Sequence, residues 1–148
     1  MLERTKLIQE LIHDEGERFG AYRDSLGLWT IGVGHLLGNT QRMIEITPAE
    51  SRALLLVDID AAEKVVSGLL PNWRSDYDPT RQRALVNMAF NLGNRLATFH
   101  KFLGHLRNGK DYVLAVQEMH NSTWAKQVGD RAIRLADMIL FGEDKNGY

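Results

Sequence analysis

The chain reads Glu15-Gly-Glu-Arg-Phe-Gly-Ala-Tyr-Arg-Asp24-Ser-Leu-Gly-Leu-Trp-Thr30-Ile-Gly-Val-Gly-His35 near its beginning. Two carboxylates, Glu15 and Asp24, stand nine residues apart in this stretch, and Thr30 follows six residues after the second. Glycines alternate with β-forming residues after Asp24, which is the pattern of a helix end that runs into tight β-hairpins. Such a layout can place two carboxyl groups on different elements, as the separation of an acid role from a base role requires.

An amphipathic helix is predicted just before this stretch. Its apolar residues recur at helical spacing: Leu7, Ile8, Leu11 and Ile12. The helix is expected to end near Gly16 or Gly20. Glu15 lies on the apolar side of this helix, so its carboxyl is partly withdrawn from water, which suits a general acid. The alternative is an ordinary surface glutamate in the last turn of a helix.

Local signals place the other elements. Residues 18–37 predict two or three short antiparallel strands. Thr47-Pro48-Ala49-Glu50 combines a capping threonine, a proline in the first turn and a glutamate three residues later, and predicts a long helix that ends near Ser67. Asp78-Pro79-Thr80 starts another helix in the same way.

Further helices are expected around 95–107, 111–120 and 130–140, the last with Ile133 among its core residues. The prediction is an α+β fold in a single domain over residues 1–148. A small β-containing lobe would take about 15–60 with the connecting helix. A larger helical lobe would take about 61–141 together with the N-terminal helix.

The composition excludes several classes of protein. A chain of 148 residues that is 44% apolar can bury a core, and without cysteine it has neither disulfides nor thiolate chemistry. A net charge of −1 argues against a general nucleic-acid binder. No stretch reaches the roughly 18 apolar residues of a membrane span, so no stable membrane insertion is expected. The first residues lack the apolar run of a secretory signal, which predicts accumulation in the cytoplasm.

The opening stretch resembles the catalytic region of phage-type lysozymes, the T-even phage lysozyme-like glycoside hydrolases of family 24. Their signature of Asp-Glu-Gly, Tyr-x-Asp and Gly-x-x-Thr-Ile-Gly-x-Gly-His reads here as Asp14-Glu15-Gly16, Tyr22-Arg23-Asp24 and Gly27-Leu-Trp-Thr30-Ile-Gly-Val-Gly-His35. The resemblance extends over roughly residues 5–141. It implies a lysozyme-like fold and an endolysin. That enzyme is a muramidase, which hydrolyses the β-1,4 bond between N-acetylmuramic acid and N-acetylglucosamine in peptidoglycan.

The resemblance also implies roles for three residues. Glu15 matches the general acid of the family, and Asp24 with Thr30 matches the pair that positions or activates water. By position alone, Asp24 could simply bond its own turn and Thr30 could simply be a good strand residue. Lytic transglycosylases lack the second acid, so Asp24 argues for hydrolysis. A separation of roughly 6.5–9.5 Å between the carboxyls would predict inversion, and roughly 5–5.5 Å would predict retention.

Other matched positions are structural or bind substrate. His35 and Asp58 match an ion pair that stabilises the fold, and Arg131 matches a structural or pKa-tuning residue that reaches Glu15 and Asp14. Substrate-binding positions are matched by Leu36, Phe90 and Asn91, although Phe90 can also be read as core. Asn91 stands where a longer glutamine is common in the family, and Glu118 stands where the family has an amide. The histidines are scattered, so no metal site is expected, and the resemblance implies an enzyme that needs no cofactor.

The implied partner is bacterial peptidoglycan, with no nucleic acid, and the enzyme is expected to be a monomer. It would stay in the host cytoplasm, need a separate holin-type pore, and act on the cell wall in the periplasm, where it lyses the host. One alternative is the lysozyme part of a phage tail, a tailocin or a bacteriocin. Another is a wall-binding protein without activity on a lysozyme scaffold, since fold does not imply function. A third is an enzyme that cuts chitin-like chains.

Overall fold

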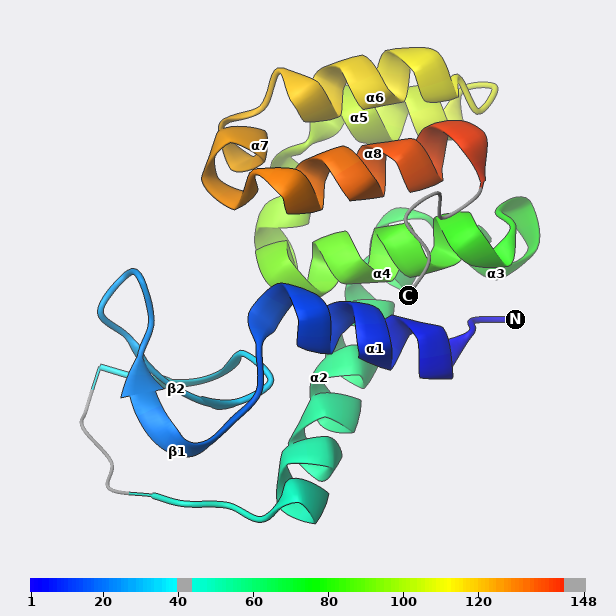
Figure 1. Cartoon of the computed structure of the whole chain (residues 1–148). Helices are drawn as coiled ribbons and strands as arrows, with labels where there is room; N and C mark the ends of the chain where they lie inside the picture. Colours follow the sequence, from blue (N-terminus) through cyan, green and yellow to red (C-terminus); the bar gives the residue numbers. More distant parts are fainter. Residues whose placement is uncertain (40–43, 143–148) are drawn as a thin grey trace. The chain divides into compact units, whose positions relative to one another are not determined.

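A computed structural model describes residues 1–39 and 44–142 of the chain. The described elements follow one another as α1 (Arg4–Glu15), β1 (Arg18–Arg23), β2 (Trp29–Gly32), β3 (His35–Gly38), α2 (Pro48–Leu69), α3 (Trp73–Asp76), α4 (Pro79–Leu92), a 3₁₀ helix (Gly93–Thr98), α5 (His100–Arg107), α6 (Tyr112–His120), α7 (Thr123–Val128) and α8 (Asp130–Phe141) (Figure 1). A small sheet followed by many helices confirms the predicted α+β class. None of the described helices combines the length and the apolar character needed to cross a bilayer.

The chain divides into two compact units by its internal contacts. The first, which we call the sheet unit, is Thr5–Ala61, and the second, the helical unit, is Met1–Arg4 with Ala62–Tyr148. Helix α1 therefore belongs to the sheet unit from Thr5 onward, and α2 runs from the sheet unit into the helical unit. The predicted single domain with two lobes stays a prediction.

The sheet is a three-stranded antiparallel meander in the order β1-β2-β3, as the sequence predicted. Tyr22 on β1 faces Thr30 on β2, and Thr30 in turn faces Leu36 on β3. The register shifts between Arg18 and Tyr22 on one side of β2 and between Trp29 and Thr30 on the other. The central strand is buried from Thr30 to Gly32, whereas much of β1 is exposed.

The start of α2 follows the predicted capping box. The Thr47 amide donates to Glu50 Oε1 at 3.0 Å, and the Glu50 amide donates to Thr47 Oγ1 at 3.1 Å. The hydrogen bond from the Thr47 amide lowers the pKa of the Glu50 carboxyl. Two amides of the helix start are thereby satisfied by side chains three residues apart, which explains why this signal could be read from sequence alone.

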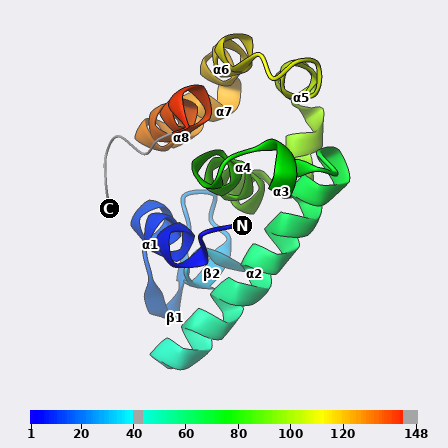
Figure 2. The same ribbon diagram turned by 90° about the vertical axis from the view of Figure 1, so that its right-hand side faces the viewer.

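The helical unit is built around α4, which is buried along most of its length. Asp78 caps α4 by accepting a hydrogen bond from the Arg81 amide at 3.1 Å. Helix α8 contacts both α4 and α6, and α5 contacts α6; Figure 2 shows α8 between α6 and α4. Arg81 also joins α4 to the end of α8, because its Nε donates to the Ile139 carbonyl at 2.6 Å and its Nη2 to the Leu140 carbonyl at 3.0 Å.

Two details differ from the sequence prediction. The helix expected around 95–107 is a 3₁₀ helix up to Thr98, and only α5 after it is α-helical. The chain turns at Phe99, whose ψ of 58° is not helical.

Ile133, expected in the core, is 53% exposed. An apolar residue on the outer face of a helix is ordinary, because the polar residues of a domain are too few to cover its surface.

Tyr77 should make the stability of the protein sensitive to alkali. It is buried before α4, its hydroxyl donates to the Leu106 carbonyl at 3.3 Å, and burial raises its pKa from 10.0 to about 12. Because the folded pKa is the higher one, this contribution to stability is complete below pH 10 and is lost as the pH rises through 12. We expect the wild type to lose roughly 2 kcal/mol more of its free energy of unfolding between pH 9 and 12 than Tyr77→Phe does. Urea denaturation at a series of pH values measures this, and equal losses in both proteins would contradict it.

Candidate active site

Glu15 is the last residue of α1, and its side chain lies against the turn between β2 and β3. A Cβ atom at position 34 would lie 2.9 Å from Glu15 Oε1 and 3.0 Å from its Cδ. Gly34 also has a φ of +62°, in the left-handed region that favours glycine. The end of α1 can therefore pack against the turn between β2 and β3 because position 34 is a glycine and has no side chain.

Asp24 follows β1 directly and folds back on the loop between β1 and β2. Its Oδ1 accepts hydrogen bonds from the amides of Leu26 and Leu28, both at 2.9 Å. The Asp24 amide donates to the Leu28 carbonyl at 2.8 Å, and the Gly27 amide donates to the Asp24 carbonyl at 3.0 Å. The turn role that its position suggested is therefore present. It uses only one carboxylate oxygen, because Oδ2 makes no hydrogen bond to a residue that the structure describes.

Thr30 lies at the centre of the sheet. It is only 4% exposed, and its hydroxyl donates to the Leu28 carbonyl at 3.2 Å. Leu36, its neighbour on β3, is 56% exposed and so offers an apolar surface to solvent. Glu15, Asp24, Thr30 and Leu36 all belong to the sheet unit.

Tyr22 links the two carboxylates electrostatically. Burial raises the pKa of its phenol, the Arg18 guanidinium opposes this, and the negative charges of Glu15 and Asp24 raise the pKa further. Both carboxylates therefore lie within electrostatic reach of one hydroxyl group. No role was predicted for Tyr22, although the family motif contains it two residues before Asp24.

His35 and Asp58 are in contact within the sheet unit. His35 Nδ1 lies 2.7 Å from Asp58 Oδ2, which ties the start of β3 to α2. Each side chain is about one quarter exposed, at 26%. Within residues 1–39 and 44–142, no three His, Asp or Glu side chains come together as metal ligands would. The pair has the form of a structural clamp, and that role stays a prediction.

The remaining predicted residues lie in the helical unit. Arg131 is 7% exposed, and its Nε donates to Asn87 Oδ1 at 2.9 Å. Asn91 Oδ1 accepts a hydrogen bond from the indole nitrogen of Trp124 at 2.7 Å, so the carbonyl of this side chain is already engaged. Phe90 is half-buried. The predicted approach of Arg131 to Glu15 and Asp14 concerns residues of different units and stays a prediction.

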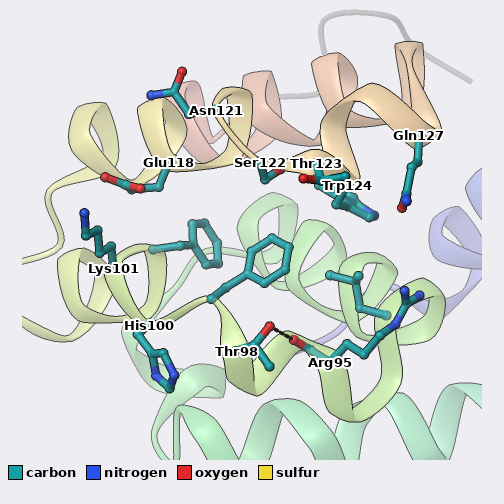
Figure 3. A pocket seen from close by; sticks show the side chains of 13 residues that line it. Arg95, Thr98, His100, Lys101, Glu118, Asn121, Ser122, Thr123, Trp124 and Gln127 are labelled. Atoms are coloured by element: carbon teal, nitrogen blue, oxygen red, sulfur yellow. Dashed lines mark hydrogen bonds between the residues drawn. The ribbon is translucent and has the colours of Figure 1, made fainter.

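A cavity of about 710 Å³ opens in the helical unit, and Glu118, which stands where the family has an amide, is among the residues that line it. Its apolar wall includes Phe99, whose ring lies edge-on to Phe102 at 6.5 Å and to Trp124 at 6.1 Å. Figure 3 shows Lys101 and Glu118 toward one end of it, and Arg95 and Gln127 toward the other. The cavity thus combines aromatic surface with neutral polar side chains, two cationic groups and one carboxylate. The lining residues come from two separate segments, 92–102 and 118–127, which no local motif could have joined.

The comparison with known families agrees with the opening motif. Residues 13–136 match the family described as phage lysozyme. The chain belongs to this family. As a phage lysozyme it is a glycoside hydrolase that acts on peptidoglycan. The match includes Glu15, Asp24 and Thr30 and extends through most of α8.

The similar proteins include a probable lysozyme, an endolysin and a phage spike protein. The lysozyme is 32% identical to a probable T4-type lysozyme 1 of Dictyostelium discoideum, over 89% of this chain and 92% of that protein. It is 39% identical to the endolysin of Salmonella phage P22, over 58% of this chain and 60% of that one. It is also 30% identical to the pre-baseplate central spike protein Gp5 of Enterobacteria phage T4, over 92% of this chain but only 28% of Gp5. The same domain therefore resembles both free-standing enzymes and a segment of a larger phage protein.

Proposed function

We propose that this lysozyme hydrolyses the β-1,4 bond between N-acetylmuramic acid and N-acetylglucosamine, with Glu15 as general acid and Asp24 and Thr30 as the residues that place the attacking water. One observation carries the assignment: Glu15 at a helix end, Asp24 in a hairpin loop and Thr30 on the central strand all belong to one compact unit. Two carboxyl groups carried by separate elements are what hydrolysis of a glycosidic bond uses.

The proton balance of the step assigns each group a task. The Glu15 carboxyl gives its proton to the glycosidic oxygen as the bond to the anomeric carbon breaks. A water molecule adds to that carbon and loses a proton to the Asp24 carboxylate, through the oxygen Oδ2 that its loop leaves without a hydrogen bond among the described residues. Thr30, on the strand that follows the Asp24 loop, is assigned the second oxygen that holds this water. Its hydroxyl proton goes to the Leu28 carbonyl, so Oγ1 can accept a hydrogen bond from the water.

The biological role that we propose is lysis of the bacterial host by a free, monomeric endolysin. The enzyme would accumulate in the host cytoplasm, pass through a holin-type pore and cut the wall in the periplasm. The similarity to the P22 endolysin supports this role. The similarity to part of Gp5 supports a second candidate, the lysozyme segment of a phage tail. Finding the protein in purified virions would favour that candidate, and finding it only in lysates would favour the endolysin.

The chemistry is tested by the products. Purified protein is added to Gram-negative cells with permeabilised outer membranes, the loss of turbidity is followed, and the released muropeptides are weighed by mass spectrometry. We expect lysis and fragments that end in reducing N-acetylmuramic acid. Fragments that end in anhydro-muramic acid would show a transglycosylase reaction in place of hydrolysis. Asp24 would then not have its proposed role. Binding to the wall without any cleavage would leave only a binding protein.

A further inference from the structure

Tyr22 occupies a place beside both residues that are proposed to hold the water. It lies opposite Thr30 in the register of β1 and β2, so the two side chains project from the same face of the sheet. Asp24 follows Tyr22 by two residues along the chain, just past the end of β1. The row Tyr22, Thr30 and Leu36 crosses all three strands. Tyr22 is therefore the polar neighbour of Thr30 on the β1 side.

The ring of Tyr22 contacts a cationic side chain, whereas its hydroxyl forms no hydrogen bond with a residue that the structure describes. The Arg18 guanidinium carbon lies 4.4 Å from the centre of the ring, a distance typical of a cation–π contact. No residue that the structure describes makes a hydrogen bond with the hydroxyl. Burial and the charges of Glu15 and Asp24 raise the pKa of the phenol from its ordinary value of 10.0, so it stays protonated from pH 5 to 9. A neutral O–H group, on a ring that contacts Arg18, thus lies within electrostatic reach of the two carboxylates and is able to donate.

A water molecule that attacks a sugar carbon has two lone pairs and two hydrogens with which it can form bonds. One lone pair forms the new bond to carbon, and the two hydrogens can be donated to Asp24 Oδ2 and to Thr30 Oγ1, both of which can accept. The second lone pair needs a donor if the water is to be fully oriented, because ordered waters in proteins usually make about three hydrogen bonds. Asp24 and Thr30 provide acceptors only, since the Thr30 proton is given to the Leu28 carbonyl.

We propose that Tyr22 is a further catalytic residue, whose hydroxyl donates a hydrogen bond to the attacking water that Asp24 and Thr30 hold. This inference rests on the proposed function, because it needs that water. It adds a third member to the water site and assigns the donor that the other two cannot provide.

The test is Tyr22→Phe, which removes the hydroxyl and keeps the ring under Arg18. We expect kcat on soluble peptidoglycan chains to fall about 10- to 100-fold, with KM unchanged, because the lost hydrogen bond orients the nucleophile and does not bind the substrate. The melting temperature should not change, since the hydroxyl bonds to no described residue. The loss in kcat should be the same from pH 5 to 9, because the phenol does not titrate there.

A matched control is Tyr112→Phe on α6. Tyr112 is also half-buried, with the Arg81 guanidinium carbon 3.7 Å from the centre of its ring, but it belongs to the helical unit and has no proposed role. Its activity should equal that of the wild type. Full kcat in Tyr22→Phe would overturn the inference. So would an unchanged maximal rate with a shifted acidic limb of the pH profile, because the hydroxyl would then act on a carboxylate and not on the water.

The same assay separates this inference from the proposed function. Glu15→Gln and Asp24→Asn are measured beside Tyr22→Phe. If both keep wild-type rates, the assignment of the catalytic carboxylates fails, whatever Tyr22→Phe does. If both lose activity and Tyr22→Phe does not, only the role of Tyr22 is lost.

Discussion

Glu15→Gln should lower the rate of peptidoglycan hydrolysis by about 10²- to 10⁴-fold, the range that a positioned general acid contributes. The amide has the shape of the carboxyl but no proton that it can give to the leaving oxygen. It also fits the same space against Gly34, where Glu15 Oε1 lies in the structure, so the fold should be kept. The rate of turbidity loss and the yield of reducing muropeptides measure the effect.

The control for this substitution lies two residues further along the chain. Glu17 is also a half-buried carboxylate in the sheet unit, but its Oε2 accepts a hydrogen bond from Ser51 Oγ at 2.6 Å, which ties the start of the sheet to α2. Glu17→Gln keeps an oxygen that can accept this hydrogen bond, so its activity should stay near that of the wild type. If Glu15→Gln were as active as Glu17→Gln, another group would have to protonate the leaving oxygen.

The parts of the fold that the sequence predicted are those that depend on neighbouring residues. The capping box of Thr47 and Glu50 is closed by atoms three residues apart, and the strand pairing follows from short turns. The family motif predicted Glu15, Asp24 and Thr30 as a set, and the structure places all three in the sheet unit. Local chemistry and a dense motif therefore predict this unit well.

The features of the fold and the site that were not predicted depend on contacts between residues that are distant in the chain. Helices α3 and α7 have only four and six residues, and such short helices are stabilised by packing more than by their own sequence. The hydrogen bond from Trp124 to Asn91 joins residues 33 positions apart and engages a side chain that was expected to contact substrate. The role proposed for Tyr22 needed the strand register, which pairs it with Thr30. A tyrosine in a predicted strand is otherwise only a good β-former.

The contact between Glu15 and Gly34 leads to the second large effect: Gly34→Ala should lower the activity of the folded enzyme by about 100-fold. The added methyl group would lie 2.9 Å from Glu15 Oε1, 3.0 Å from Cδ and 3.1 Å from Cγ, which is too close for all three atoms. The end of a glutamate side chain can swing away, so the clash is relieved by moving the carboxyl. A displacement of about 1 Å at a reacting group can cost about 10²-fold in rate.

The backbone strain at position 34 needs its own control, because an alanine with a φ of +62° costs about 1–2 kcal/mol wherever it occurs. Gly109→Ala provides it: this glycine lies between α5 and α6 with a φ of +89°, and a Cβ atom there meets nothing within 4 Å. Both variants should lose a similar free energy of unfolding in urea. Only Gly34→Ala should also lose activity, because only there does the new methyl group occupy the space of the proposed acid. Equal activity of Gly34→Ala and Gly109→Ala would mean that the position of the Glu15 carboxyl does not depend on the turn between β2 and β3.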